Sequence, residues 1–68
     1  MNEEYEEKLY NVELVTEQGL YGDEVAYDIL QLMFSADVVT VRGHSITVEE
    51  IEVTDKGVTR FHGKLKEK

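Results

Sequence analysis

The sequence predicts a small α+β domain of two layers, in which one helix packs on a mainly antiparallel sheet in the order β-α-β-β-β. The helix is predicted because apolar residues within 23–36 recur with a helical spacing. The strands are predicted because apolar residues elsewhere alternate with polar ones or are β-branched, in residues 8–16, 38–41, 45–53 and 58–66. The 68 residues contain no proline and no low-complexity linker, so we expect one domain over residues 1–68.

The segment KLYNVELVT is predicted to form the first strand, because alternate residues from Tyr10 to Leu14 are apolar. The glycine-containing segment EQGLYG, residues 17–22, is predicted to be the turn that ends this strand. Residues 1–8 are rich in glutamate. We expect them to form a short helix or a frayed end, because an isolated helix of this length is only marginally stable in water. At the other end, residues 66–68 are expected to form a disordered tail.

The predicted helix, residues 23–36, has more apolar residues than one buried face requires. Asp23 suits the N-cap position, and Glu24 in the first turn suits the positive end of the helix dipole. One broad face is predicted to pack on the sheet and consists of Val25, Ala26, Ile29, Leu32, Met33 and Ala36. A second apolar stripe on the far flank consists of Tyr27, Leu30 and Phe34.

This second stripe requires a cover of its own. The cover is intramolecular if Tyr5 and Leu9, or Leu20 and Tyr21, fold over it. It is intermolecular if a second copy of the chain or another protein binds there, since exposed aromatic and aliphatic side chains on one patch are typical of interfaces. The predicted partner-binding residues are Glu24, Tyr27, Asp28, Leu30, Gln31 and Phe34.

The last two strands are predicted to form a hairpin with one irregularity. In ITVEEIEV the apolar parity changes between Ile46 and Ile51, which predicts a bulge or short break near Glu49 and Glu50. The five-residue loop TDKGV contains Gly57, where a positive φ is easily accommodated. The hairpin then pairs Val53 with Thr59, Glu52 with Arg60, Ile51 with Phe61 and Glu50 with His62.

This register predicts the orientation of each side chain in the hairpin. Ile51 and Phe61 should be buried opposite each other, while Glu52 and Arg60 face solvent, because a shift by one residue would bury two charges. The inward residues of the last strand are then Thr59, Phe61, Gly63 and Leu65, and the outward residues are Arg60, His62, Lys64 and Lys66.

The formal charge of −8 is unevenly distributed along the chain. Residues 1–53 carry thirteen acidic and two basic residues, whereas residues 54–68 carry five basic and two acidic residues. A field of this sign repels phosphate backbones, so direct binding to nucleic acid is not favoured. The alternative function is a nucleic-acid-binding module that uses the basic last strand, through Arg60, His62, Lys64 and Lys66.

Residues suited to catalysis or metal binding are scarce. His44 and His62 are the only histidines, and there is no cysteine, no HExxH, no GxSxG and no phosphate-binding glycine loop. His62 beside Glu50 fits a surface charge pair better than an acid–base pair. Glu49 and Glu50 are neighbours at the predicted bulge and fit solvated residues better than a catalytic carboxylate pair. We expect no enzymatic activity, cofactor, metal site or small-molecule substrate.

The function predicted from these patterns is that of a non-enzymatic, small acidic protein-interaction module. It binds a protein partner, or itself as a homodimer, through helix 23–36 and its acidic surroundings. A sharper form is a nucleic-acid mimic, such as a phage-type or bacterial inhibitor whose carboxylates occupy phosphate positions on a target. The acidic start has no signal-peptide pattern and no run is long enough to span a membrane, so we expect a soluble cytoplasmic protein.

Overall fold

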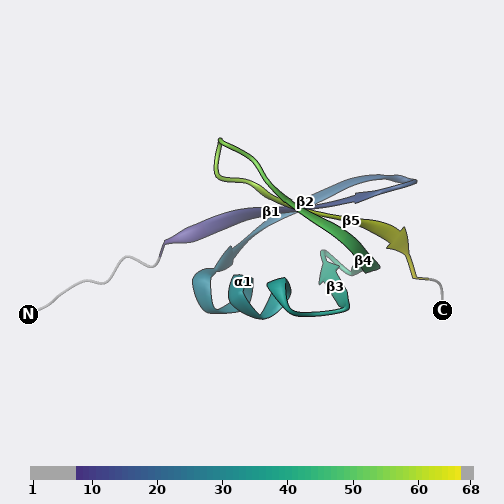
Figure 1. Ribbon diagram of the computed structural model, residues 1–68, viewed down its shortest axis with the longest axis horizontal. Coiled ribbons are helices and arrows are strands. Elements are labelled where there is room, and N and C mark those ends of the chain that lie inside the picture. The colour runs from purple at the N-terminus through teal and green to yellow at the C-terminus, as the bar shows by residue number, and fades with distance from the viewer. Residues whose placement is uncertain (1–7, 67–68) are drawn as a thin grey trace, which may run out of the picture.

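Five strands and one helix follow one another along residues 8–66, the part of the chain that the computed structural model describes (Figure 1). The elements in chain order are β1 (Leu9–Thr16), β2 (Gly19–Ala26), α1 (Tyr27–Phe34), β3 (Val38–Val41), β4 (His44–Val53) and β5 (Thr59–Leu65). The fold is therefore α+β with the order β-β-α-β-β-β. The predicted order was wrong by one strand, β2.

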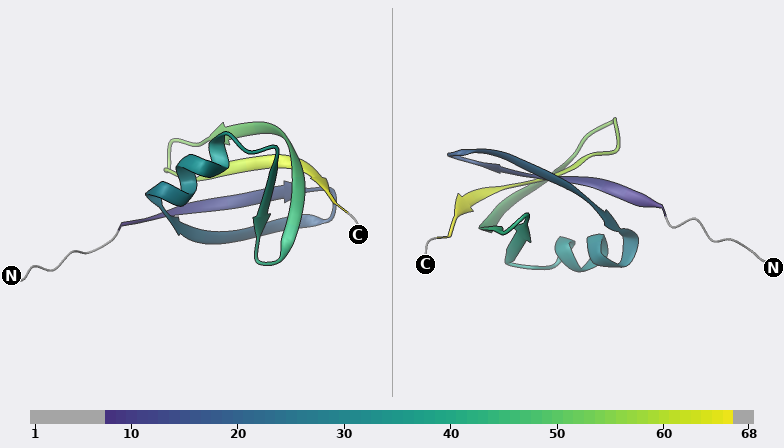
Figure 2. Two further views of the ribbon diagram at one scale, coloured as in Figure 1. Left: turned by 90° about the horizontal axis from the view of Figure 1, so that it is seen from below. Right: turned by 180° about the vertical axis from the view of Figure 1, so that it is seen from behind.

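All five strands belong to one sheet with the order β2-β1-β5-β4-β3. Neighbouring strands are antiparallel, except that β1 and β5 at the centre run parallel. The sheet is strongly twisted and curls so that β3 and α1 lie on the same side of it (Figures 1 and 2). One face of the sheet is thus covered by the short helix and β3, and no element of residues 8–66 covers the other face, which we call the open face.

The strand β2 occupies residues that were predicted to be a turn and the start of the helix. Thr16 closes the turn before β2, because its hydroxyl accepts the Gln18 N–H at 3.0 Å and donates to the Gly19 carbonyl at 2.9 Å. From Gly19 onward every residue of β2 pairs with β1. Asp23 is consequently opposite Val12 in the sheet and does not cap the helix. Pairing with β1 satisfies the backbone groups of β2, and this outweighs weak local helix propensity.

The helix α1 is eight residues long and begins after Ala26, which makes no side-chain capping bond. Leu30 and Met33 are its buried residues. Ile29 and Leu32, which were predicted to face the sheet, are 45% and 67% exposed. The predicted orientation was therefore wrong for Ile29 and Leu32 but right for Met33, which is 8% exposed. The helix starts four residues later than predicted, and Leu30 lies beside Met33 in the core. The buried apolar core consists of Val12, Leu14, Leu30, Met33, Val39, Val41, Ile46 and Phe61.

The β4–β5 hairpin has the predicted register. Glu50 is opposite His62, Ile51 opposite Phe61, Glu52 opposite Arg60 and Val53 opposite Thr59. The register shifts between Val48 and Glu50, which confirms the predicted bulge. In the loop, the Thr54 N–H donates to the Val58 carbonyl at 2.9 Å and Gly57 has a φ of 84°. Opposed apolar pairs, opposed charges and a glycine in the loop all favour the same pairing.

One part of the hairpin prediction is wrong. Phe61 is completely buried, but Ile51 is 37% exposed and Val53 is 64% exposed. The reason is the twist of the hairpin. The loop that follows Val53 projects from the side of the sheet opposite α1 (Figure 1), so the end of the hairpin that carries Ile51 and Val53 turns away from the helix.

The two ends of the chain were predicted to be a short helix or frayed segment (1–8) and a disordered tail (66–68). Residues 1–7 and 67–68 lie outside the described part. Lys66 is described, and its N–H donates to the Ser45 carbonyl at 2.8 Å, so strand pairing continues to this residue. Across residues 8–66, no helix has the length and apolar character needed to cross a membrane.

Candidate interaction surfaces

An apolar groove lies between α1 and β3 on the covered side of the sheet. Its volume is about 220 Å³. The partly exposed apolar side chains around it include Leu32 (67% exposed), Ile29 (45%) and Val38 (41%). We call it the α1–β3 groove, and its lining residues are Ile29, Leu32, Met33, Ala36, Val38, Val39 and Thr40. Neighbouring apolar side chains with this exposure mark the groove as the candidate interaction surface of α1.

The predicted partner-binding stripe on α1 is divided between core and surface. Leu30 is only 5% exposed, so of the two alternatives left open for this stripe it belongs to the core. Tyr27 is 56% exposed, and its ring lies 5.7 Å from the ring of Tyr10. Gln31 is also exposed, and its side-chain amide donates to the Tyr27 hydroxyl at 2.6 Å. Phe34 is 39% exposed, with its ring turned toward the core.

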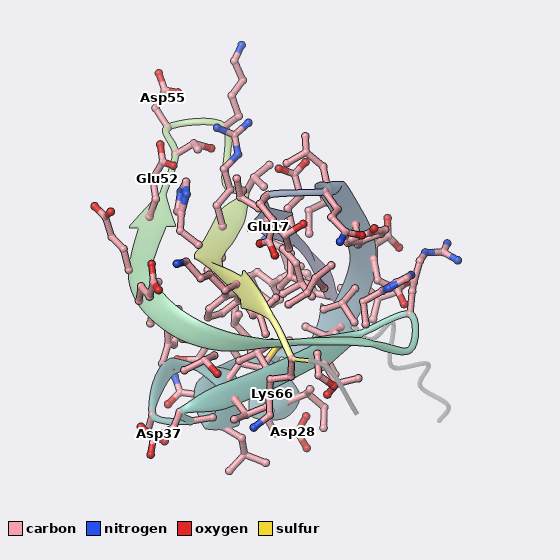
Figure 3. All side chains as sticks on the ribbon, turned by 90° about the vertical axis from the view of Figure 1, so that its right-hand side faces the viewer. Glu17, Asp28, Asp37, Glu52, Asp55 and Lys66 are labelled. Carbon is pink, nitrogen blue, oxygen red and sulfur yellow. The ribbon has the colours of Figure 1, made fainter. Side chains whose placement is uncertain are left out.

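The acidic residues predicted beside this stripe lie on different elements. Glu24 is an exposed residue of β2 and not of the helix. Asp28 is exposed in the first turn of α1, where its carboxylate accepts the Ile29 N–H at 2.9 Å. Asp37 is exposed between α1 and β3. In Figure 3, Asp28 and Asp37 appear beside α1, while Glu52 and Asp55 lie on the projecting β4–β5 hairpin.

The open face of the sheet carries a row of alternating charges across three strands. Arg60 on β5 is central, and its Nε donates to the Glu13 carboxylate of β1 at 2.9 Å. A terminal nitrogen of Arg60 lies 4.0 Å from the Glu52 carboxylate of β4. The same Glu52 oxygen lies 2.9 Å from Nε2 of His62. These contacts arise because Glu13, Arg60 and Glu52 occupy one row of the sheet.

This network bears on the predicted basic strand. Arg60 and His62 point outward and contact glutamates, as predicted, but the partner of His62 is Glu52 and not Glu50, and the shorter contact of Arg60 is to Glu13. Lys64 and Lys66 are exposed on β5 and directly after it. Neutralisation by neighbouring carboxylates reduces the positive potential available to a phosphate backbone. The residue opposite Lys64 is Thr47, which is not aromatic, so this position provides no stacking partner for a base.

A seam where the curled sheet brings β2 close to the β3–β4 turn was not predicted. The Nε of Arg42 donates to the Gly22 carbonyl at 2.8 Å. The rings of Tyr21 and His44 stack with centroids 3.8 Å apart and planes inclined by 15°. Arg42 and Gly43 have φ values of 54° and 81°. The segment RGHS between two β-branched runs predicts a turn here, and the two positive φ values are typical of a type I′ hairpin turn.

The candidate residues for acid–base or metal chemistry lie on different parts of the described structure. Glu49 lies at the bulge and Glu50 opposite His62, and both carboxylates are exposed. His44 is engaged in the stack with Tyr21 and lies on a different part of the sheet. Among residues 8–66, histidine, aspartate and glutamate form no group of three placed to hold a metal ion. No protein-family model, curated protein or solved structure matches this chain.

Proposed function

We propose that this protein is a non-enzymatic interaction module that binds a protein partner through the α1–β3 groove and the acidic residues around it. The observation that carries the proposal is the exposure of Ile29, Leu32 and Val38 beside one open groove. Leaving three large aliphatic side chains in water on one small patch is unfavourable, and their burial in a complex would provide binding free energy. Tyr27 and Phe34, on the other flank of α1, are also exposed in part and are residue types that anchor interfaces.

The charges around the groove favour a basic partner. Residues 27–41 contain Asp28 and Asp37 but no lysine or arginine. The whole chain has a formal charge of −8. Opposite charge on the partner would steer the encounter and exclude acidic competitors. Self-association through the same groove would place like charges together, so we favour a different protein over a second copy of this chain.

A sharper form of the proposal is a nucleic-acid-mimic inhibitor. Glu24, Asp28 and Asp37 are exposed on β2, α1 and the segment after α1, which gives a rigid display of carboxylates. Such a display supports binding to a surface that normally holds phosphates. Competition distinguishes the two forms: a mimic is displaced from its target by duplex DNA or RNA, whereas a partner held mainly in the apolar groove is not.

The test is affinity capture from an extract of the source cells with three versions of the protein as bait. Leu32→Ser removes an exposed side chain of the groove, and Leu20→Ser removes one of similar exposure (61%) on β2, away from the groove. We expect a specific protein to be captured by the wild type and by Leu20→Ser and to be depleted with Leu32→Ser. Equal capture by all three baits would contradict a role for the groove.

A further inference from the structure

Within residues 8–66, the strand β3 has a free edge. β3 is the last strand in the sheet order, and β4 is its only neighbour among the described strands. The two-residue turn pairs Val41 with His44, and the next pairs are Thr40 with Ser45, Val39 with Ile46 and Val38 with Thr47. In an antiparallel hairpin of this kind, alternate pairs exchange hydrogen bonds. The backbone groups of Val38 and Thr40 therefore point away from β4.

An adjacent hydrogen bond agrees with this assignment. The Val48 N–H donates to the Asp37 carbonyl at 2.9 Å, so the hydrogen-bonded positions of the β3 segment are the odd-numbered ones. Outside the strand ladders, none of the hydrogen bonds within residues 8–66 involves the backbone N–H or C=O of Val38 or Thr40. Thr40 contributes only its hydroxyl, which lies 2.6 Å from the Ser45 hydroxyl. The free edge of β3 thus presents two donors and two acceptors to an incoming chain.

The other edge of the sheet, β2, is protected in a way that β3 is not. By the same alternation, the outward groups of β2 include those of Gly22 and Glu24. The Gly22 carbonyl accepts the Nε–H of Arg42, and the Glu24 N–H donates to the Asp23 carboxylate at 2.8 Å. Charged side chains on an edge strand also discourage strand pairing. On β3 the corresponding side chains are Val38 and Thr40, which are uncharged.

The α1–β3 groove adjoins this free edge. Val38, Val39 and Thr40 line the groove from the strand, while Ile29, Leu32 and Ala36 line it from the helix. A strand added to β3 would direct every second side chain toward the apolar residues of α1. The span from the start of α1 to the end of β3, residues 27–41, contains two charged residues, and both are aspartates, Asp28 and Asp37. They would attract lysine or arginine beside the bound strand.

We propose that the partner of this protein binds as an extended segment that adds a sixth strand to the free edge of β3. This inference rests on the proposed function of the groove and specifies its ligand. The segment has aliphatic or aromatic residues at alternate positions, which fill the groove, and lysine or arginine near its ends. Main-chain hydrogen bonds to Val38 and Thr40 contribute affinity, and the groove selects the side chains.

The test uses a phage-displayed library of random 12-residue peptides selected on the intact protein. Affinities of the enriched peptides are then measured for the wild type and four variants. Thr40→Pro removes the outward N–H of β3, and Thr40→Ala is its control because it retains the N–H and also loses the hydroxyl contact with Ser45. Leu32→Ser alters the groove, and Leu20→Ser is its control.

We expect enriched peptides to show alternating apolar residues with basic ends and to lose at least tenfold in affinity with Thr40→Pro and Leu32→Ser, but not with the controls. Loss with Leu32→Ser alone, with equal affinity for Thr40→Pro and Thr40→Ala, would overturn strand addition and leave the groove as the binding site. Absence of enrichment, or equal affinity for Leu32→Ser and Leu20→Ser, would overturn both this inference and the proposed function.

Amide hydrogen exchange provides a second measurement that does not depend on the folding of Thr40→Pro. In a complex of the wild type with an enriched peptide, the amides of Val38 and Thr40 should gain protection of at least tenfold. Val39 and Val41 already lie in hydrogen-bonded pairs with β4 and should change less. Protection confined to residues of α1 or β2 would contradict strand addition at β3.

Discussion

The ring of Phe34 lies 6.3 Å from the ring of Phe61, with the two planes inclined by 46°. Phe34 is the last residue of α1, and Phe61 is a completely buried residue of the central strand β5. This tilted contact connects the end of the helix to the middle of the sheet, next to Leu30 and Met33 in the same core. The contact orients α1 so that Leu30 faces inward while Ile29 and Leu32 remain at the surface.

Phe61 is predicted to be the side chain whose loss is most costly. Phe61→Ala should reduce the free energy of unfolding by about 3–5 kcal/mol, because it leaves a cavity beneath α1. Ile51→Ala is the matched control on the opposite strand, and its cost should be under about 2 kcal/mol because Ile51 is 37% exposed. Urea denaturation of both variants provides the comparison. Equal losses would mean that the sheet is not packed around Phe61.

The rotation of α1 can be tested with two leucines of the same helix. Leu30→Ala should cost about 2–5 kcal/mol because Leu30 is 5% exposed. Leu32→Ala should change stability by less than about 1 kcal/mol because Leu32 is 67% exposed. Both substitutions remove the same side-chain atoms, so the difference between the two losses of stability in thermal melts reports the difference in burial between Leu30 and Leu32. A larger loss for Leu32→Ala would show that the helix presents its other face to the core.

Gly63 is predicted to be required for pairing β4 with β5. A Cβ atom at Gly63 would overlap the backbone carbonyl oxygen of Thr47, which cannot move without breaking the sheet. Gly63→Ala should therefore cost more than about 2 kcal/mol or prevent folding. At Gly22, an added Cβ would make ordinary contacts of 3.5 Å and 3.6 Å. Circular dichroism and denaturation should show Gly22→Ala folded, with a change below about 1 kcal/mol.

The charge row on the open sheet face is predicted to contribute little to stability. The side chains of Arg60 and Glu13 are 39% and 29% exposed, so solvent and salt screen their attraction. Arg60→Ala should cost under about 1 kcal/mol. A double-mutant cycle with Glu13→Gln measures the coupling, which should decrease between low and high salt. A salt-independent coupling of several kcal/mol would show that the pair is effectively buried.

The histidines are predicted to have no part in partner binding. His62 contacts Glu52 on the open sheet face, and His44 stacks on Tyr21 at the seam, so neither lines the α1–β3 groove. The double variant His44→Gln/His62→Gln should bind peptides selected on the wild type with an affinity within about threefold of the wild type. A loss of one hundredfold would point to a metal or acid–base site and against the groove.

Local patterns were sufficient to predict the C-terminal hairpin. The parity of Ile46 and Ile51, the loop around Gly57 and the opposed charges of Glu52 and Arg60 are relations between residues that are close in the chain. A change of register by one residue reverses every side chain, so such a pattern permits one pairing only. The existence of an exposed apolar flank on α1 was predictable for the same reason, since the helix has more apolar residues than one face can bury.

The residues that form that flank were decided by tertiary structure. The segment GLYGDEVA has two glycines and two acids, and it became strand β2 because β1 was available to pair with it along its whole length. Because residues up to Ala26 pair with β1, α1 begins at Tyr27 and not at residue 23 as predicted. In this helix Leu30 lies in the core, whereas Ile29 and Leu32 are exposed. The exposure of Ile51 and the free edge of β3 likewise depend on the twist of the sheet and on strand order. These are relations between elements distant in the chain, and no local periodicity encodes them.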